Sequence, residues 1–375
     1  WSDAYVPEGE ILDDDALFSS AIDGVPFSNT NVSWDGWGIL PDDYAEGEFR
    51  LVRILHVKGK VDGLLRNDLI WVDAMTGRVW LRNNEVVHHL GEHTTHQMGL
   101  TSRPEVKSTE PIHPVTSLNE NNLVVVSGQT NAQAHAMYPF EASETLGMPH
   151  LKLDLGANVY FTDENGGFIT NETGGVFAVN IPLEGKWSTV FTNGVTPSVS
   201  LDLQEGYNLL DVSDNVKEAS AYRSVNLIHD HMREWLTNFT ALDISMTTNI
   251  DVEGECNAFF DGGSINFFDT GGGCNPTSLI ADVVYHEYGH AINGYFYNTL
   301  GSGFNNGAMN EGYADFWAMS LGDIAEIGKG FYEENNDGIR KYDSDPKVYP
   351  DNLVGEVHAD GEIIAGAWYD THLLM

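Results

Sequence analysis

The chain has 375 residues, and its 56 Asp and Glu residues against 18 Lys and Arg residues give a formal net charge of -38 at pH 7. Such acidity opposes binding to nucleic acid and to anionic membranes, because their phosphate groups would be repelled. No apolar run is long enough to cross a bilayer and no signal peptide is visible; since the chain begins at Trp1, we expect that a leader was removed or lies outside this sequence.

The length predicts several domains, and three regions can be distinguished: residues 1–98, 99–213 and 214–375. In the first region, residues 49–55 and 69–80 are typical of strands, with a turn at Ala74-Met75-Thr76-Gly77. Four histidines follow at His88, His89, His93 and His96. They lack helical spacing and a distant partner, so a polar linker is favoured over a metal site.

The second region, residues 99–213, is predicted to be rich in β-structure. Strand candidates occur at residues 122–128, 150–161, 175–181 and 187–191. Turn signals, above all Asp163-Glu164-Asn165-Gly166-Gly167, favour antiparallel sheet and a small sandwich. This region could pack on the third region or bind substrate.

The third region, residues 214–375, opens with a predicted helix at 219–239. Apolar residues recur there at helical spacing and should face a core: Tyr222, Val225, Ile228, Met232, Trp235 and Phe239. Two short strands joined by a turn are then expected, and the only two cysteines, Cys256 and Cys274, bracket them. We prefer a disulfide between them, which fits an oxidising compartment; two free buried thiols are the alternative.

A zinc site is predicted from the pattern His286-Glu287-x-x-His290. The apolar residues of 278–296 suit a buried helix, on which residues four apart share one face, so both imidazoles can meet one ion while Glu287 stays off the metal. Catalytic zinc typically keeps three protein ligands and one open position, and Glu311, on a second helical pattern, is the candidate third ligand. The alternative is that both histidines belong to the core.

With Asn310-Glu311 and Asp315 about twenty residues after it, this pattern resembles the thermolysin-like and fungalysin-like zinc endopeptidases, the gluzincins. The resemblance implies a thermolysin-like lobe with an active-site helix, a catalytic Zn²⁺, and Glu287 as general base and acid. It also implies that Asp315 hydrogen-bonds a ligand histidine, which a zinc-bound imidazole needs on its other nitrogen. A solvated acid on a helix face is the alternative for Asp315.

Two further segments carry the same resemblance. The run Gly355 to Ile363 is similar to the fungalysin-type Glu-Val-His-x-x-Gly-Glu block, which implies that His358 stabilises the oxyanion, with Asp351 as a candidate to orient it. A structural histidine is the alternative. Asn257 and Ala258 resemble an edge strand that pairs with the substrate backbone, although an ordinary sheet edge also fits.

The phrase Val72-Asp73-Ala74-x-Thr76-Gly77 resembles the end of the propeptide domain that precedes these peptidases. Residues 1–98 are therefore expected to be either propeptide-like, in a zymogen whose site its own propeptide masks, or an accessory α+β domain. The sequence stops at Met375 where the family has further helices, so we expect an incomplete C-terminal lobe. No residue securely matches the family's pocket arginine or assisting tyrosine; Arg340, and Tyr295 or Tyr297, are guesses.

The expected fold class is thus α+β, with β-rich N-terminal regions before a zinc-peptidase lobe. The expected function is that of a secreted zinc metalloendopeptidase that hydrolyses proteins or peptides. Calcium is a second candidate cofactor without assigned ligands, because acidic clusters are usually only solvated. The alternative is a secreted β-rich binding or adhesion protein whose peptidase-like lobe is inactive or masked.

Overall fold

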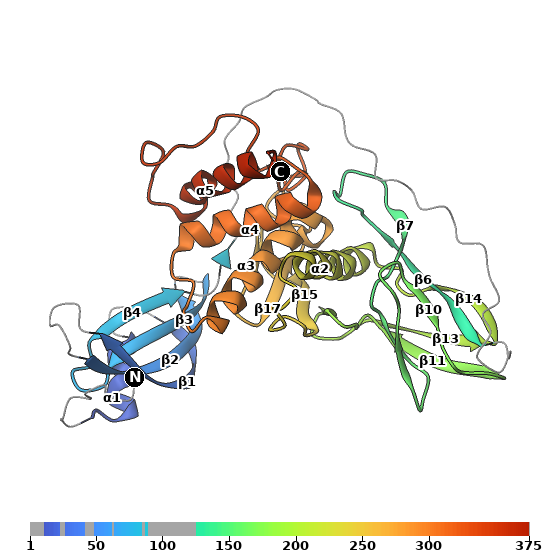
Figure 1. The fold of residues 1–375 in the computed structure, drawn as a ribbon, viewed down its shortest axis with the longest axis horizontal. Coiled ribbons are helices and arrows are strands. Elements are labelled where there is room, and N and C mark those ends of the chain that lie inside the picture. Colours follow the sequence, from blue (N-terminus) through green and yellow to red (C-terminus); the bar gives the residue numbers. More distant parts are fainter. Residues whose placement is uncertain are drawn as a thin grey trace. The chain divides into compact units, whose positions relative to one another are not determined.

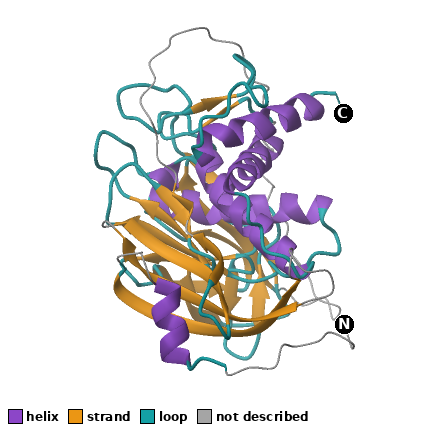
Figure 2. Cartoon of the chain, turned by 90° about the vertical axis from the view of Figure 1, so that its left-hand side faces the viewer, coloured by secondary structure: helices purple, strands orange, loops and turns teal. Residues whose placement is uncertain are grey.

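A computed structural model describes residues 11–22, 27–41, 49–61, 64–84, 87–88 and 125–374. The chain divides into two compact units, residues 1–87 with 260–262, and residues 88–259 with 263–375. Helices and sheets both contribute to the described residues (Figure 2), which agrees with the expected α+β class. None of the described helices combines the length and apolar character that a membrane span needs.

The first unit is a helix on an antiparallel sheet (Figure 1). Its elements are α1 (Asp14–Ile22), β1 (Ser28–Pro41), β2 (Phe49–Val61), β3 (Leu64–Asp73) and β4 (Val79–Asn84), and the sheet order is β1-β2-β3-β4. The predicted turn lies between β3 and β4, where Gly77 adopts a positive φ of 72°. Leu17 and Ala21 of α1 pack into the apolar core of this unit, in which Leu55 pairs with Ile70 across β2 and β3.

The first part of the second unit is rich in strands, as predicted. These are β6 (Val126–Ala134), β7 (Glu144–Gly147), β8 (Lys152–Asp154), β9 (Val159–Phe161), β10 (Gly167–Ile169), β11 (Val176–Pro182), β12 (Ser188–Thr192), β13 (Ser198–Gln204) and β14 (Gly206–Asp211). One sheet has the order β10-β6-β14 with β7 paired to β6, while β8 pairs with β9 and β11 with β13. The β6–β14 pair is parallel, which differs from the antiparallel pairing expected throughout this region.

The remaining elements of the second unit include the two helices, α3 and α4, that carry the candidate metal ligands. They are α2 (Val216–Trp235), β15 (Met246–Val252), β16 (Ala258–Phe260), β17 (Ser264–Phe268), the 3-10 helix η1 (Thr277–Leu279), α3 (Ala281–Thr299), α4 (Gly307–Gly322), β18 (Glu326–Ile327), β19 (Arg340–Lys341) and α5 (Val357–His372). A mixed sheet has the order β12-β15-β17-β16-β5, where β5 is Val87–His88.

The ends of both predicted helices differ by three or four residues, at 216 and 235 for α2 and at 281 and 299 for α3. The zinc-motif helix begins at Ala281, three residues after Ser278, because residues 277–279 form η1 and Ile280 is extended. On α2, Tyr222, Val225, Ile228 and Met232 are buried as predicted. Trp235 is 60% exposed instead of facing a core, because α2 ends at this residue.

Helix α4 packs against both α3 and α5 (Figure 1). Glycines allow the close approach at both contacts. A Cβ on Gly289 of α3 would lie 2.8 Å from the Cα of Ala314, and one on Gly312 of α4 would lie 2.5 Å from the carbonyl oxygen of Gly361. Neither position has room for a side chain, so α3, α4 and α5 meet through their backbones.

Candidate metal centre

Helix α3 places the two predicted ligand histidines on one buried face. His286 and His290 are one helical turn apart, and their rings are 4.6 Å apart between centroids and nearly perpendicular. Their Nε2 atoms lie only 3.0 Å from each other. Glu287, between them in sequence, is 1% exposed.

Helix α4 adds the predicted third ligand. Oε2 of Glu311 lies 3.3 Å from Nε2 of His286, and Oε1 lies 3.7 Å from Nε2 of His290. One ligand atom from each of the three residues falls within 4.8 Å of the others, and all three side chains are buried. The structure therefore brings together the whole ligand set that the sequence predicted.

The outer nitrogen of each histidine contacts an oxygen. Nδ1 of His286 lies 2.6 Å from Oδ1 of Asp315, and Nδ1 of His290 lies 3.2 Å from Oδ1 of Asn310. The amide of Asn293 donates to the same Asn310 oxygen at 2.8 Å, which fixes that oxygen as an acceptor. A carboxylate or amide oxygen can only accept, so in a neutral ring the hydrogen sits on Nδ1 and the Nε2 lone pair is free to bind a cation.

This donor set fits a divalent metal. Two Nε2 lone pairs and a carboxylate converge in a buried space, where uncompensated acceptors would repel one another. Two imidazoles and one carboxylate form a ligand set of catalytic zinc. Asp315 takes the position expected for it, on the outer nitrogen of His286.

The pKa values of the three candidate ligands are shifted by burial and by the charges of their neighbours. Burial opposes protonation of His286, but Asp315 and Glu311 outweigh it and raise the pKa of His286 to about 10. Burial lowers the pKa of His290 to about 4, and the charge of His286 contributes. Burial opposes ionisation of Glu311, but His358, His290 and His286 hold its pKa at about 2. A metal ion can bind His286 only after its proton leaves, so metal binding should release a proton.

Two residues behind Asp315 were not predicted for this place. Arg340 of β19 donates from Nε to Oδ2 of Asp315 at 2.5 Å and from Nη2 to Oδ1 at 2.6 Å, and the Tyr342 hydroxyl also donates to Oδ2. Burial opposes ionisation of Asp315, but Arg340 and His286 hold its pKa well below its usual range. The sequence suggested Arg340 only as a guess for a pocket arginine, and Tyr342 lies in no motif.

His358, the predicted oxyanion histidine, is at the start of α5. Its Nε2 lies 3.5 Å from Oε1 of Glu311, which places the ring beside the ligand set. Its Nδ1 lies 2.6 Å from Oε1 of Glu356, so the residue that contacts this nitrogen is Glu356 and not Asp351.

The remaining candidates lie as follows. Cys256 and Cys274 form a disulfide, which confirms that prediction. Asn257, just before β16, and Ala258, its first residue, are both buried. β16 lies between β17 and β5 and is not the edge strand that was expected, and contact of the two residues with substrate stays a prediction. Tyr297 packs on Phe304 and has no assigned role. His89, His93 and His96 lie outside the described residues.

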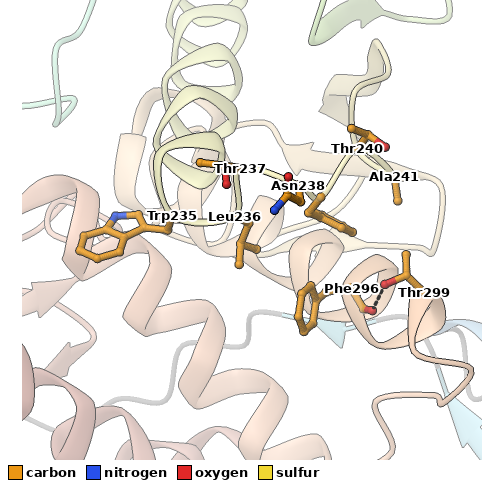
Figure 3. Close-up of a pocket in the computed structure, with 9 residues that line it drawn as sticks. Trp235, Leu236, Thr237, Asn238, Thr240, Ala241, Phe296 and Thr299 are labelled. Carbon is orange, nitrogen blue, oxygen red and sulfur yellow. Dashed lines mark hydrogen bonds between the residues drawn. The ribbon is translucent and has the colours of Figure 1, made fainter.

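A separate hollow lies at the C-terminal ends of α2 and α3 (Figure 3). Its volume is about 470 Å³. Its lining consists of Trp235, Leu236, Thr237, Asn238, Phe239, Thr240, Ala241, Phe296 and Thr299. No ionisable side chain is among these residues, and none of them belongs to the metal centre.

Comparison of the sequence with models of protein families gives no match, and comparison with curated proteins gives none either.

Proposed function

We propose that the chain is a zinc-dependent endopeptidase. The observation that carries the proposal is the convergence of the Nε2 atoms of His286 and His290 on the carboxylate of Glu311, with both Nδ1 atoms held by oxygens. The buried Glu287 and the neighbouring His358 supply the two other groups that peptide hydrolysis needs.

Bound zinc would lower the pKa of a water molecule and polarise the peptide carbonyl oxygen. In this scheme Glu287 accepts the proton of the attacking water and passes it to the departing amine. With both ring nitrogens protonated, His358 donates from Nδ1 to the Glu356 carboxylate and from Nε2 to the carbonyl oxygen as that oxygen gains negative charge. Asp315, held by Arg340 and Tyr342, keeps His286 in the orientation that a ligand requires.

The decisive experiment compares the parent protein with the Glu287→Gln variant. Both are loaded with zinc, and metal content and hydrolysis of casein and of a quenched fluorescent peptide are measured. We expect the variant to keep its zinc and to lose activity by roughly 100-fold to 10,000-fold, the usual worth of a general base. Glu234→Gln, which changes an exposed acid on α2, is the matched control and should keep full activity.

Two results would contradict the proposal. A zinc-loaded parent protein that hydrolyses neither substrate would favour the binding or adhesion alternative. A Glu287→Gln variant as active as the Glu234→Gln control would show that Glu287 is not the base.

A further inference from the structure

The carboxylate of Glu356 makes two kinds of contact at once. As the N-cap of α5, it accepts the backbone N–H of His358 at 3.1 Å through Oε1 and that of Ala359 at 2.9 Å through Oε2. Its Oε1 also lies 2.6 Å from Nδ1 of the His358 ring. One side chain therefore caps the helix and holds the imidazole two residues later.

Holding one ring nitrogen determines where the other points, because an imidazole is rigid. With Nδ1 on Glu356, Nε2 of His358 is directed at the metal centre, 3.5 Å from Oε1 of Glu311. The His358 side chain is 15% exposed, so packing covers most of the ring, and Glu356 supplies a polar contact that sets its rotation.

The position of the carboxylate is itself restrained. Asp360, in the first turn of α5, accepts the N–H groups of Val354 and Gly355 at 2.8 and 3.0 Å, which ties the loop before Glu356 to the helix. Burial opposes ionisation of Glu356, but the Ala359 N–H and His358 hold the pKa of Glu356 below its usual range. The carboxylate of Glu356 is thus held by the Ala359 N–H and His358, although its side chain is 48% exposed.

We infer that Glu356 is a positioning residue that aims His358 at the reacting carbonyl oxygen, beyond its role as a helix cap. The inference rests on the proposed peptidase function. A cap alone would not need a long side chain, because Ser, Asp or Thr caps a helix at least as well. The two oxygens of Glu356 make three contacts, with two backbone N–H groups and with Nδ1, which the single hydroxyl oxygen of Ser or Thr cannot all accept.

Three variants separate the two roles. Glu356→Ser keeps one capping oxygen but removes the carboxylate that contacts Nδ1. Glu356→Gln keeps the length and an acceptor oxygen, and Glu356→Ala loses both contacts. We expect Glu356→Ser to lower kcat roughly 10-fold to 100-fold, part of what loss of an oxyanion donor costs, with KM and zinc content unchanged. Glu356→Gln should restore most of kcat, and only Glu356→Ala should lower the melting temperature clearly.

A readout other than activity is the affinity for zinc-binding inhibitors. A phosphinic peptide mimics the tetrahedral transition state, so its affinity for Glu356→Ser should fall by the same factor as kcat. A hydroxamate too short to reach His358 should bind the parent protein and Glu356→Ser equally. In a His358→Ala background, Glu356→Ser should have no further effect on kcat, because its partner is gone.

The outcomes are distinguishable. If the parent protein is active but Glu356→Ser keeps full kcat, or lowers kcat equally with and without His358, Glu356 is a cap only and the inference is wrong. If the zinc-loaded parent protein hydrolyses nothing and binds no phosphinic peptide, the proposed function fails, and the inference fails with it.

Discussion

Replacement of Asp282 by Asn should stabilise the metal-free protein at pH 8 but not at pH 4.5. Asp282 lies in the first turn of α3 with no exposed surface, and its Oδ1 accepts the N–H of Gly328 at 3.1 Å. Burial raises its pKa from 3.8 to about 7, opposed by the Gly328 N–H and reinforced by the charge of Asp315. Folding therefore favours the protonated form of this carboxyl group.

The sign and size of the effect follow from this pKa. Between about pH 4 and pH 7 the unfolded chain has lost the proton that the folded chain still holds, so stability falls as pH rises through this window. The gap between 3.8 and about 7, at about 1.4 kcal/mol for each pH unit, corresponds to about 4 kcal/mol. Asn resembles the protonated acid and removes this cost.

The assay is urea unfolding of chelator-treated protein at pH 4.5, 6 and 8, followed by tryptophan fluorescence. The gain from Asp282→Asn should be near zero at pH 4.5 and grow to a few kcal/mol at pH 8. Asp345→Asn, at a side chain that is 90% exposed, is the matched control and should show no such trend. A gain that is the same at pH 4.5 and pH 8, or a loss of stability at pH 8, would refute the reasoning.

Four other predictions concern the metal and the fold. Asp315→Asn should weaken zinc binding roughly 10-fold to 100-fold, measured by competition with a chromophoric chelator, because His286 loses a charged partner. Removal of zinc should lower the melting temperature, and free zinc at 1,000 times its Kd should restore about 4 kcal/mol. Replacing Cys256 and Cys274 by Ser should cost about 3 kcal/mol in urea unfolding, given their separation of 18 residues. Burial opposes ionisation of Asp230, but His150 and His229 outweigh it and lower the pKa of Asp230 to about 2. The ionised Asp230 should therefore stabilise the fold above about pH 4, and this stabilisation should be lost as pH falls toward 2. Acid unfolding of Asp230→Asn should lack this step.

The ligand set could be predicted from sequence because it depends on local spacing. Residues four apart on a helix share a face whatever the surrounding fold, so His286 and His290 had to meet. Glu311 lies on the next helix along the chain, and α4 packs directly on α3. The disulfide could be predicted from the sequence for the same reason, because both cysteines flank one hairpin.

Contacts made by distant segments could not be predicted in this way. Arg340 and Tyr342 reach Asp315 from β19 and the residue after it, and β19 is only two residues long, too short to give a sequence pattern. The parallel pairing of β6 with β14 joins segments about 80 residues apart, whereas turn signals inform only on neighbouring strands. Helical periodicity on α2 could not show that the helix ends at Trp235 and leaves it exposed.

The backbone contact of α3 with α4 at Gly289 has a consequence for metal capture. No side chain separates α3 from α4 at this point, so the helix that carries the histidines packs directly against the helix that carries Glu311. Folding of the chain then carries the entropic cost of bringing the three ligand side chains together, so an ion binds to a preorganised site. A bulkier residue at position 289 would push α3 away from α4 and increase the distance between the histidines and Glu311. The site would then favour an ion of larger radius.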